Sequence, residues 1–223
     1  MKFPLNIKAV IFDLDGLLID SEPYWQKADD LFLKSLGVKE YDPKWLRKQM
    51  YGRGQRECAE IYIKAFNLKE TVDDLVSKRW NILYSFLMKD LKLMPGAEEI
   101  LNLLFKSNLK IALATGGHLE NKARQILKKL EVDRYFYLFV SGLDVGRSKP
   151  FPDIYLETAK RLSVDANECL VLEDAPNGVL SSKAANMVVY GVNADEKMRR
   201  ELKKAGADRV YRSLSEIKMG DIW

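Results

Sequence analysis

The sequence predicts an α/β protein with a doubly wound, mainly parallel sheet and an α-helical cap inserted after the first strand. Short apolar runs alternate with segments of helical periodicity over most of the 223 residues, a pattern typical of βαβ units. Between residues 21 and 93 no strand run occurs, and helical patterns follow one another. We therefore expect an α/β core at 1–18 and 94–223, with the helical cap at 19–93.

The first strand is expected at 9–14, a nearly continuous apolar run typical of a parallel strand buried on both faces. The other expected strands are 110–115, 138–141, 169–173, 188–192 and 209–211. The helices expected between them are 97–107, 120–130, 152–162, 177–186 and 196–205. Right-handed crossovers would bring the carboxyl ends of the strands, and any functional groups there, to one edge of the sheet.

The cap is expected to contain helices at 23–36, 43–50, 57–66 and 72–89. Pro23 stands at a helix start, where proline is tolerated, and Ser21 is a candidate cap for the same helix. The sequence Met94-Pro95-Gly96 breaks the helical pattern and returns the chain to the core.

Composition narrows the class of protein. Hydrophobic residues make up 47% of the chain and charged residues 30%, as in a globular protein, and the net charge is +4. This charge favours small anionic substrates. Because the basic clusters are interleaved with acidic residues along helices, we expect no nucleic-acid partner. No apolar stretch approaches the ~18 residues that would span a membrane, so we expect no membrane partner either.

Cysteine usage and the N-terminus bear on the cellular compartment. Cys58 and Cys169 stand far apart without the spacing of metal ligands, and the N-terminus lacks the apolar segment of a secretion signal. We therefore expect a cytoplasmic protein. No self-complementary apolar stripe indicates an oligomer, so a monomer is favoured.

Two pairs of acids stand at the ends of apolar strand runs: Asp13 with Asp15, and Glu173 with Asp174. Buried carboxylates are costly at such positions unless they face a cleft or a metal. Adjacent carboxylates suit Mg²⁺, which binds carboxylates together with water and phosphate oxygens. For either pair alone, an ordinary solvated turn is the alternative.

Anion-binding groups are expected near the same edge. Thr115 precedes Gly116 and Gly117, so a hydroxyl, open backbone and a helix N-terminus can meet an anion. Lys149 precedes Pro150, which biases the lysine towards extended geometry. Each feature alone is common in turns and on surfaces. Together with the acids they supply a nucleophile, a proton donor, a metal site and a fixed cation, the set that phosphoryl transfer requires.

These motifs, in this order, resemble those of the haloacid dehalogenase superfamily: the run from Asp13 to Glu22, then Thr115, Lys149-Pro150 and Glu173-Asp174. The helical insertion resembles the small helical (C1-type) cap of that superfamily, and the chain is most similar to its β-phosphoglucomutase-like phosphatases. The resemblance covers nearly the whole chain.

The resemblance implies a role for each matched residue of the reaction centre. Asp13 would be the nucleophile that becomes an aspartyl-phosphate, and Asp15 would protonate the leaving alcohol and then activate water. Thr115, the Gly116 N–H and Lys149 would hold the phosphoryl group.

The resemblance also implies a Mg²⁺ site. The ion would bind the Asp13 carboxylate, the Asp15 main-chain carbonyl and Asp174, with Glu173 in the coordination sphere or just outside it. Because Asp15 must be protonated when the alcohol leaves, we expect its pKa to be raised in the closed, drier site.

Three functions remain open. Asp15 argues against a dehalogenase, and Trp25 stands where the sugar phosphomutases of the subgroup carry a histidine. The favoured function is a Mg²⁺-dependent phosphatase acting on a small phosphomonoester, such as a sugar phosphate or a similar metabolite. The alternative is a hexose-phosphate mutase. A phosphometabolite-binding protein without turnover is the third, disfavoured because Asp13, Asp15 and Lys149 are all present.

Substrate specificity is expected to come from the cap. The segment 51–57 resembles the cap loop that faces the active site in this subgroup, and Arg53 is the candidate to meet a polar or anionic group of the substrate. His118, the only histidine, follows Gly117. We interpret it as a helix-start residue rather than a catalytic one.

Overall fold

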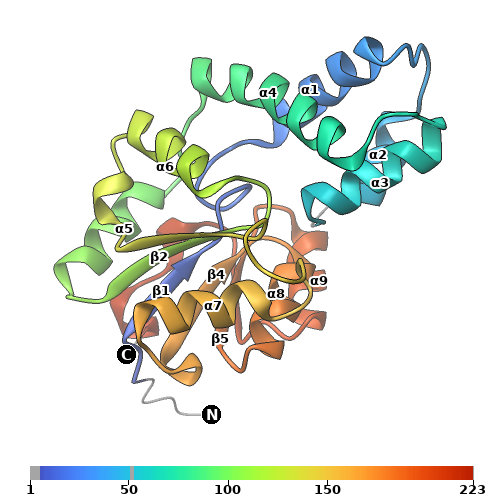
Figure 1. Cartoon of the computed structure of the whole chain (residues 1–223). Coiled ribbons are helices and arrows are strands. Elements are labelled where there is room, and N and C mark those ends of the chain that lie inside the picture. Colours follow the sequence, from blue (N-terminus) through green and yellow to red (C-terminus); the bar gives the residue numbers. More distant parts are fainter. Residues whose placement is uncertain (1–5, 51–52, 223) are drawn as a thin grey trace.

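The computed structural model describes residues 6–50 and 53–222 (Figure 1). Six strands form one sheet in the order β3-β2-β1-β4-β5-β6, and every pair of neighbouring strands is parallel. The strands are β1 (Ala9–Phe12), β2 (Lys110–Thr115), β3 (Leu138–Ser141), β4 (Cys169–Glu173), β5 (Val188–Val192) and β6 (Arg209–Tyr211). The predicted parallel α/β fold is confirmed.

Helices cover both faces of this sheet. The core helices are α5 (Ala97–Lys106), α6 (Glu120–Lys129), α7 (Asp153–Leu162), α8 (Pro176–Ala184) and α9 (Glu196–Lys204). Short 3₁₀ turns lie at η1 (Asp133–Tyr135), η2 (Ala166–Glu168), η3 (Leu214–Glu216) and η4 (Met219–Asp221). None of the described helices is long and apolar enough to cross a membrane.

The first strand is two residues shorter than expected. It ends at Phe12, because the chain leaves the sheet after Asp13 and turns at Gly16, whose φ is 80°. Glycine adopts this left-handed conformation without steric cost. The two acids of the first motif therefore lie in the loop beyond the strand.

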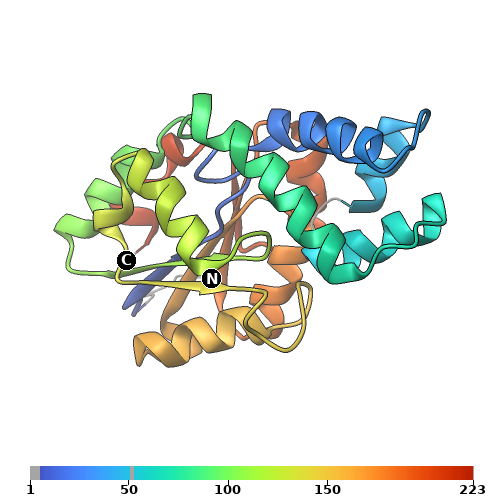
Figure 2. The same ribbon diagram turned by 45° about the horizontal axis from the view of Figure 1, so that its top comes forward.

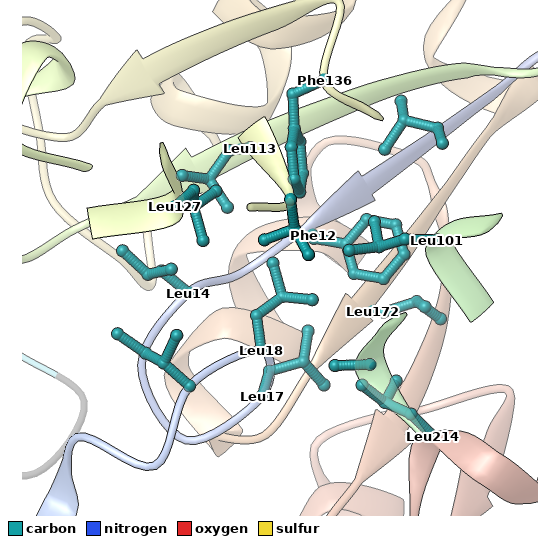
Figure 3. Packing of buried hydrophobic residues seen from close by; sticks show 14 of the residues in the cluster. Phe12, Leu14, Leu17, Leu18, Leu101, Leu113, Leu127, Phe136, Leu172 and Leu214 are labelled. Atoms are coloured by element: carbon teal, nitrogen blue, oxygen red, sulfur yellow. The ribbon is translucent and has the colours of Figure 1, made fainter. Parts of the chain in front are cut away.

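Alternation along the strands divides the core into two apolar layers, since successive side chains of a strand point to opposite faces. Phe12 packs on one face with Leu101 of α5 and Leu127 of α6, as Figure 3 shows. Ile11 points the other way, into the cluster that includes residues of α7, α8 and α9. This two-sided burial explains why the strand runs are continuously apolar.

The described residues between β1 and α5 form four helices, which we call the helical unit: α1 (Glu22–Ser35), α2 (Pro43–Met50), α3 (Gln55–Phe66) and α4 (Val72–Asp90). Figures 1 and 2 show it gathered at one end of the sheet, away from the described N-terminal residues. Phe32 and Tyr62 lie in an apolar cluster of its own. Trp25 and Trp80 instead belong to the cluster that includes Phe12, so the base of the unit packs on the α/β core.

A buried polar network ties three helices of this unit together. Asp29 of α1 accepts a hydrogen bond from the Tyr62 hydroxyl of α3 at 2.6 Å and from Nε of Arg79 of α4 at 2.7 Å. Arg79 also donates to Oε1 of Gln55 at 2.8 Å. Arg79 is only 5% exposed and Asp29 only 7%. Burying both charges is tolerable because each is paired and hydrogen-bonded.

Ser21 stands at the N-cap position of α1, as predicted, but its side chain does not cap the helix. Helix α1 begins at Glu22, and the Ser21 side chain makes no capping hydrogen bond. Ser21 is buried. Its hydroxyl interacts with the Asp15 carboxyl group instead and lowers the pKa of that group.

Breaking the buried ion pair should destabilise the helical unit. We expect Arg79→Met to lower the free energy of unfolding by about 3–5 kcal/mol, because it leaves the Asp29 carboxylate buried without its cation. The matched control is Arg56→Met, which breaks an exposed pair with Asp73 in the same unit and should cost less than about 1 kcal/mol. Urea unfolding of both variants measures the difference, and equal losses would contradict the assignment.

Candidate active site

The polar residues singled out in the sequence meet at the carboxyl edge of three adjacent strands. Asp13 follows β1, Gly116 follows β2, and Glu173 ends β4. Because β1 lies between β2 and β4, with Phe12 paired to Leu113 and Leu172, these strand ends lie side by side. Ligand sites of doubly wound sheets occur at this edge.

A cavity opens at this edge between the α/β core and the helical unit. From the core it is lined by Asp13, Asp15, Gly116, Gly117, Ser148, Lys149, Glu173, Asp174, Ala175 and Gly178. From the helical unit and the loop after α2 it is lined by Glu22, Trp25, Arg47, Met50, Arg53, Gly54, Gln55, Cys58 and Arg79. Thr115 lies behind this wall: it is buried, and its hydroxyl accepts a hydrogen bond from the Gly117 N–H at 3.3 Å.

Lys149 lies between two carboxylates. Its Nζ donates to Oδ1 of Asp13 at 2.6 Å and to Oε1 of Glu173 at 2.7 Å. Burial by itself would lower the pKa of Lys149, but Asp13 and Glu173 outweigh burial and hold this pKa well above its usual range. The charged form of this side chain is therefore favoured where it lines the cavity.

The surroundings of Asp13 disfavour the charged form of its carboxyl group. Burial raises its pKa to about 7, with further contributions from Glu173 and Asp15, although Lys149 acts in the opposite direction. Such perturbation by burial and neighbouring charge is typical of functional carboxylates.

Glu173 is fixed on both of its oxygens. Oε1 accepts hydrogen bonds from Lys149 and, at 2.7 Å, from the Tyr155 hydroxyl. Oε2 accepts from the backbone N–H groups of Asp174 and Ala175 at 3.0 and 3.1 Å. Because these hydrogen bonds hold the Glu173 carboxylate in place, Glu173 fixes the position of the Lys149 ammonium group.

Asp13, Glu173 and Asp174 form a carboxylate cluster of the kind that binds a divalent cation: one oxygen from each lies within 4.8 Å of the others. Burial raises the pKa of Asp174 well above its usual range, and Glu173 and Asp13 raise it further. Gly16 makes room for Asp174, since a Cβ there would lie 2.3 Å from Oδ2 of Asp174. Lys149 contacts two of these three carboxylates, and a cluster of carboxylate oxygens is the kind of ligand set that a hard divalent cation takes.

The expectation of a raised pKa for Asp15 is wrong. Burial alone would raise this pKa, but the charge of His118 and polar interactions with His118, Ser21 and Trp25 lower it.

His118 is the site residue that sequence reasoning set aside. It is fully buried, and its Nε2 lies 2.8 Å from Oδ2 of Asp15. Helix α6 begins two residues later, at Glu120. The one signal in the sequence was the position of His118 directly after Gly117, beside the expected phosphate-binding turn.

The expected specificity loop lies partly outside the described residues, since 51 and 52 are not described. Arg53 is exposed and lines the cavity. Gly54 brings the loop onto the core, because a Cβ there would lie 3.0 Å from the Ser148 Cβ. Gln55 was given no weight in the sequence, yet it is buried and held by Arg79 at the cavity wall.

This fold and this constellation are those of a phosphoryl-transfer enzyme of the doubly wound α/β class. Residues 10–192 match the haloacid dehalogenase-like hydrolase family. The chain therefore belongs to that family, and the resemblance found in the sequence is confirmed.

Named relatives give the comparison more detail. The chain is 33% identical over 205 residues to a phosphorylated carbohydrates phosphatase of Thermotoga maritima, covering 90% of this chain and 92% of that protein. It is 34% identical over 195 residues to (DL)-glycerol-3-phosphatase 2 of Arabidopsis thaliana, covering 84% and 80%. Its structure resembles that of a β-phosphoglucomutase of Clostridium difficile, with a TM-score of 0.83, 27% identity and coverage of 97% and 95%.

The close packing of Glu173 predicts different tolerances at two glycines. A Cβ at Gly178 would lie 1.7 Å from Oε1 of Glu173, whereas nothing lies within 4 Å of one at Gly116. We expect Gly178→Ala to destabilise the protein by about 1–3 kcal/mol, because the Glu173 carboxylate must move. Gly116→Ala should stay within about 0.5 kcal/mol of the parent. Thermal unfolding tests this, and an unaffected Gly178→Ala variant would refute the packing argument.

Proposed function

We propose that this chain is a Mg²⁺-dependent phosphatase that hydrolyses a small phosphomonoester, a sugar phosphate or similar metabolite, through an aspartyl-phosphate on Asp13. The observation that carries the proposal is the contact of Lys149 with Asp13 and Glu173 in a cavity that also contains Asp15. This contact places a fixed cation, Lys149, beside an anionic nucleophile, Asp13. Relatives named for phosphorylated carbohydrates and glycerol 3-phosphate support the substrate class.

The metal ligands we propose are the carboxylates of Asp13 and Asp174 and the main-chain carbonyl of Asp15. When bound, Mg²⁺ supplies positive charge that offsets the repulsion between the Asp13 carboxylate and an anionic phosphate. Glu173 would remain outside the coordination sphere, because both of its oxygens are occupied by hydrogen bonds.

In the first step, an oxygen of Asp13 forms a bond to phosphorus and the bond from phosphorus to the leaving alcohol breaks. Asp15 delivers a proton to the alcohol oxygen. Asp15 must first take up that proton, and the negative phosphoryl group arriving beside it favours the uptake. Lys149 and the Gly116 N–H would hold the phosphoryl oxygens, and Thr115, buried behind the cavity wall, would support the adjoining turn by accepting the hydrogen bond from the Gly117 N–H.

In the second step, Asp15 accepts a proton from water. The water oxygen bonds to phosphorus, the bond from phosphorus to Asp13 breaks, and inorganic phosphate leaves. Water must therefore be kept out of the site until the aspartyl-phosphate has formed.

We propose that residues 19–93 act as a cap, which controls when water reaches the aspartyl-phosphate. The contact of Gly54 with Ser148, next to Lys149, supports closure over the cavity. Arg53 would meet the substrate from this side. We place the enzyme in the cytoplasm, in line with its two separate free cysteines, both buried.

A hexose-phosphate mutase is the second candidate, favoured by the structural similarity to a β-phosphoglucomutase. Trp25, whose ring lies under the Arg79 guanidinium at 4.3 Å, offers no carboxylate, imidazole or other proton-transfer group at its position. Formation of glucose 6-phosphate from β-glucose 1-phosphate, with a glucose bisphosphate as activator, would select the mutase.

Release of inorganic phosphate from p-nitrophenyl phosphate and a panel of metabolite phosphates tests the proposed function. We expect turnover with Mg²⁺ and none with EDTA. Asp13→Asn should lose at least about a thousand-fold in kcat, as enzymes do without their nucleophile. Asp90→Asn, at an exposed carboxylate at the end of α4, is the matched control and should retain activity. Absence of turnover on every monoester by the folded, Mg²⁺-loaded protein would refute a phosphatase.

Metal binding should depend on Asp174 and be visible without turnover. Without metal, we expect Asp174→Asn to be more stable than the parent by about 1 kcal/mol, because it removes a buried charge beside Glu173 and Asp13. Added Mg²⁺ should raise the melting temperature of the parent and of Asp90→Asn, but not that of Asp174→Asn. If Asp174→Asn responds to Mg²⁺ like the parent, the ion binds elsewhere.

A further inference from the structure

Among the described residues, the His118 side chain makes one polar contact, and that contact is with Asp15. Its Nε2 lies 2.8 Å from Oδ2 of Asp15. When Asp15 is ionised its oxygens can only accept hydrogen bonds, so Nε2 then carries the proton and donates it. The other ring nitrogen, Nδ1, is buried without a hydrogen-bond partner among the described residues.

The second oxygen of Asp15 is buried but unpartnered. Oδ1 has no hydrogen-bond partner among the residues that the structure describes. A buried polar atom without a partner is uncommon and costly unless something else binds there. Oδ1 itself is buried, so the 25% of the Asp15 side chain that is exposed belongs to the rest of the group, with Oδ2 on the side of Gly117 where Asp15 lines the cavity.

The imidazole is held in place by both parts of the molecule. Trp80 of α4 packs its ring at 79° to the imidazole, with a centroid distance of 4.9 Å, and Trp25 of α1 lies at 6.2 Å. Behind the ring, the His118 carbonyl accepts a hydrogen bond from the Ser141 hydroxyl at the end of β3, at 2.7 Å. The position of the imidazole is therefore fixed without using Nδ1.

We propose that His118 is a positioning residue for Asp15: its Nε2–H holds Oδ2 and so keeps the carboxyl group in the place from which it exchanges protons with the substrate and with water. This inference rests on the proposed function. In the first step the proton moves from the Asp15 carboxyl group to the leaving oxygen while the Asp13–phosphorus bond forms and the bond from phosphorus to the leaving oxygen breaks. The Nε2–H stays on Oδ2 throughout.

The proposal predicts which side chains can replace His118. The amide nitrogen of glutamine reaches about as far from the backbone as Nε2, whereas that of asparagine reaches only as far as Nδ1. His118→Gln should therefore keep the contact with Asp15, and His118→Asn should lose it although it is equally polar. His118→Ala removes the group altogether.

The experiment measures kcat/KM for aryl and alkyl phosphates whose leaving groups range from p-nitrophenolate to a simple alcohol. This parameter reports the transfer of the phosphoryl group to Asp13. A good leaving group departs without a proton, whereas an alcohol needs one. We expect His118→Asn and His118→Ala to lose about 10- to 100-fold on alkyl phosphates and less than about threefold on p-nitrophenyl phosphate, with His118→Gln near the parent throughout.

Equal losses on all leaving groups, or equal losses in the glutamine and asparagine variants, would overturn the proposal and leave His118 as a packing residue. Melting temperatures of the variants show whether packing is affected. Failure of the proposed function is a separate result, because the parent enzyme itself would then release no phosphate from any substrate of the series.

Discussion

Lys149 lies within 2.7 Å of oxygens of both Asp13 and Glu173, and the edge of the sheet is arranged around this contact. Three buried carboxylates cluster there, and Lys149 contacts two of them. In a medium of low dielectric, such an excess of negative charge is tolerated only where hydrogen bonds and counter-charges offset it. The raised pKa values of Asp13 and Asp174 express that imbalance. A divalent cation would relieve it.

Two glycines make this concentration of carboxylates sterically possible. Gly16 and Gly178 each lie where a Cβ would collide with a carboxylate oxygen, that of Asp174 and that of Glu173 respectively. Glu173 can consequently accept four hydrogen bonds and hold Lys149, while Asp174 reaches the loop after β1. Backbone space, rather than side-chain chemistry, fixes how closely the charged groups approach one another.

The environment of Asp15 is assembled from both parts of the molecule. His118 comes from the α/β core, and Ser21 and Trp25 come from the start of the inserted segment; all three act on one carboxylate. The same Trp25 belongs to the apolar cluster that continues into the sheet. A displacement of the helical unit would therefore change the surroundings of Asp15, which links the conformation of the unit to the proton transfers proposed for that residue.

The sequence by itself determined the parallel α/β fold and the family, and it predicted a helical insertion after the first strand, because apolar runs, breaks and motifs are local properties of the chain. It also indicated that Asp13, Lys149, Glu173 and Asp174 would meet, since parallel strands end at one edge. Only the tertiary structure decided the environment of Asp15: its contact with His118 joins residues 103 positions apart. The pKa of a buried carboxylate depends on which groups surround it, and no local pattern in the sequence specifies those groups.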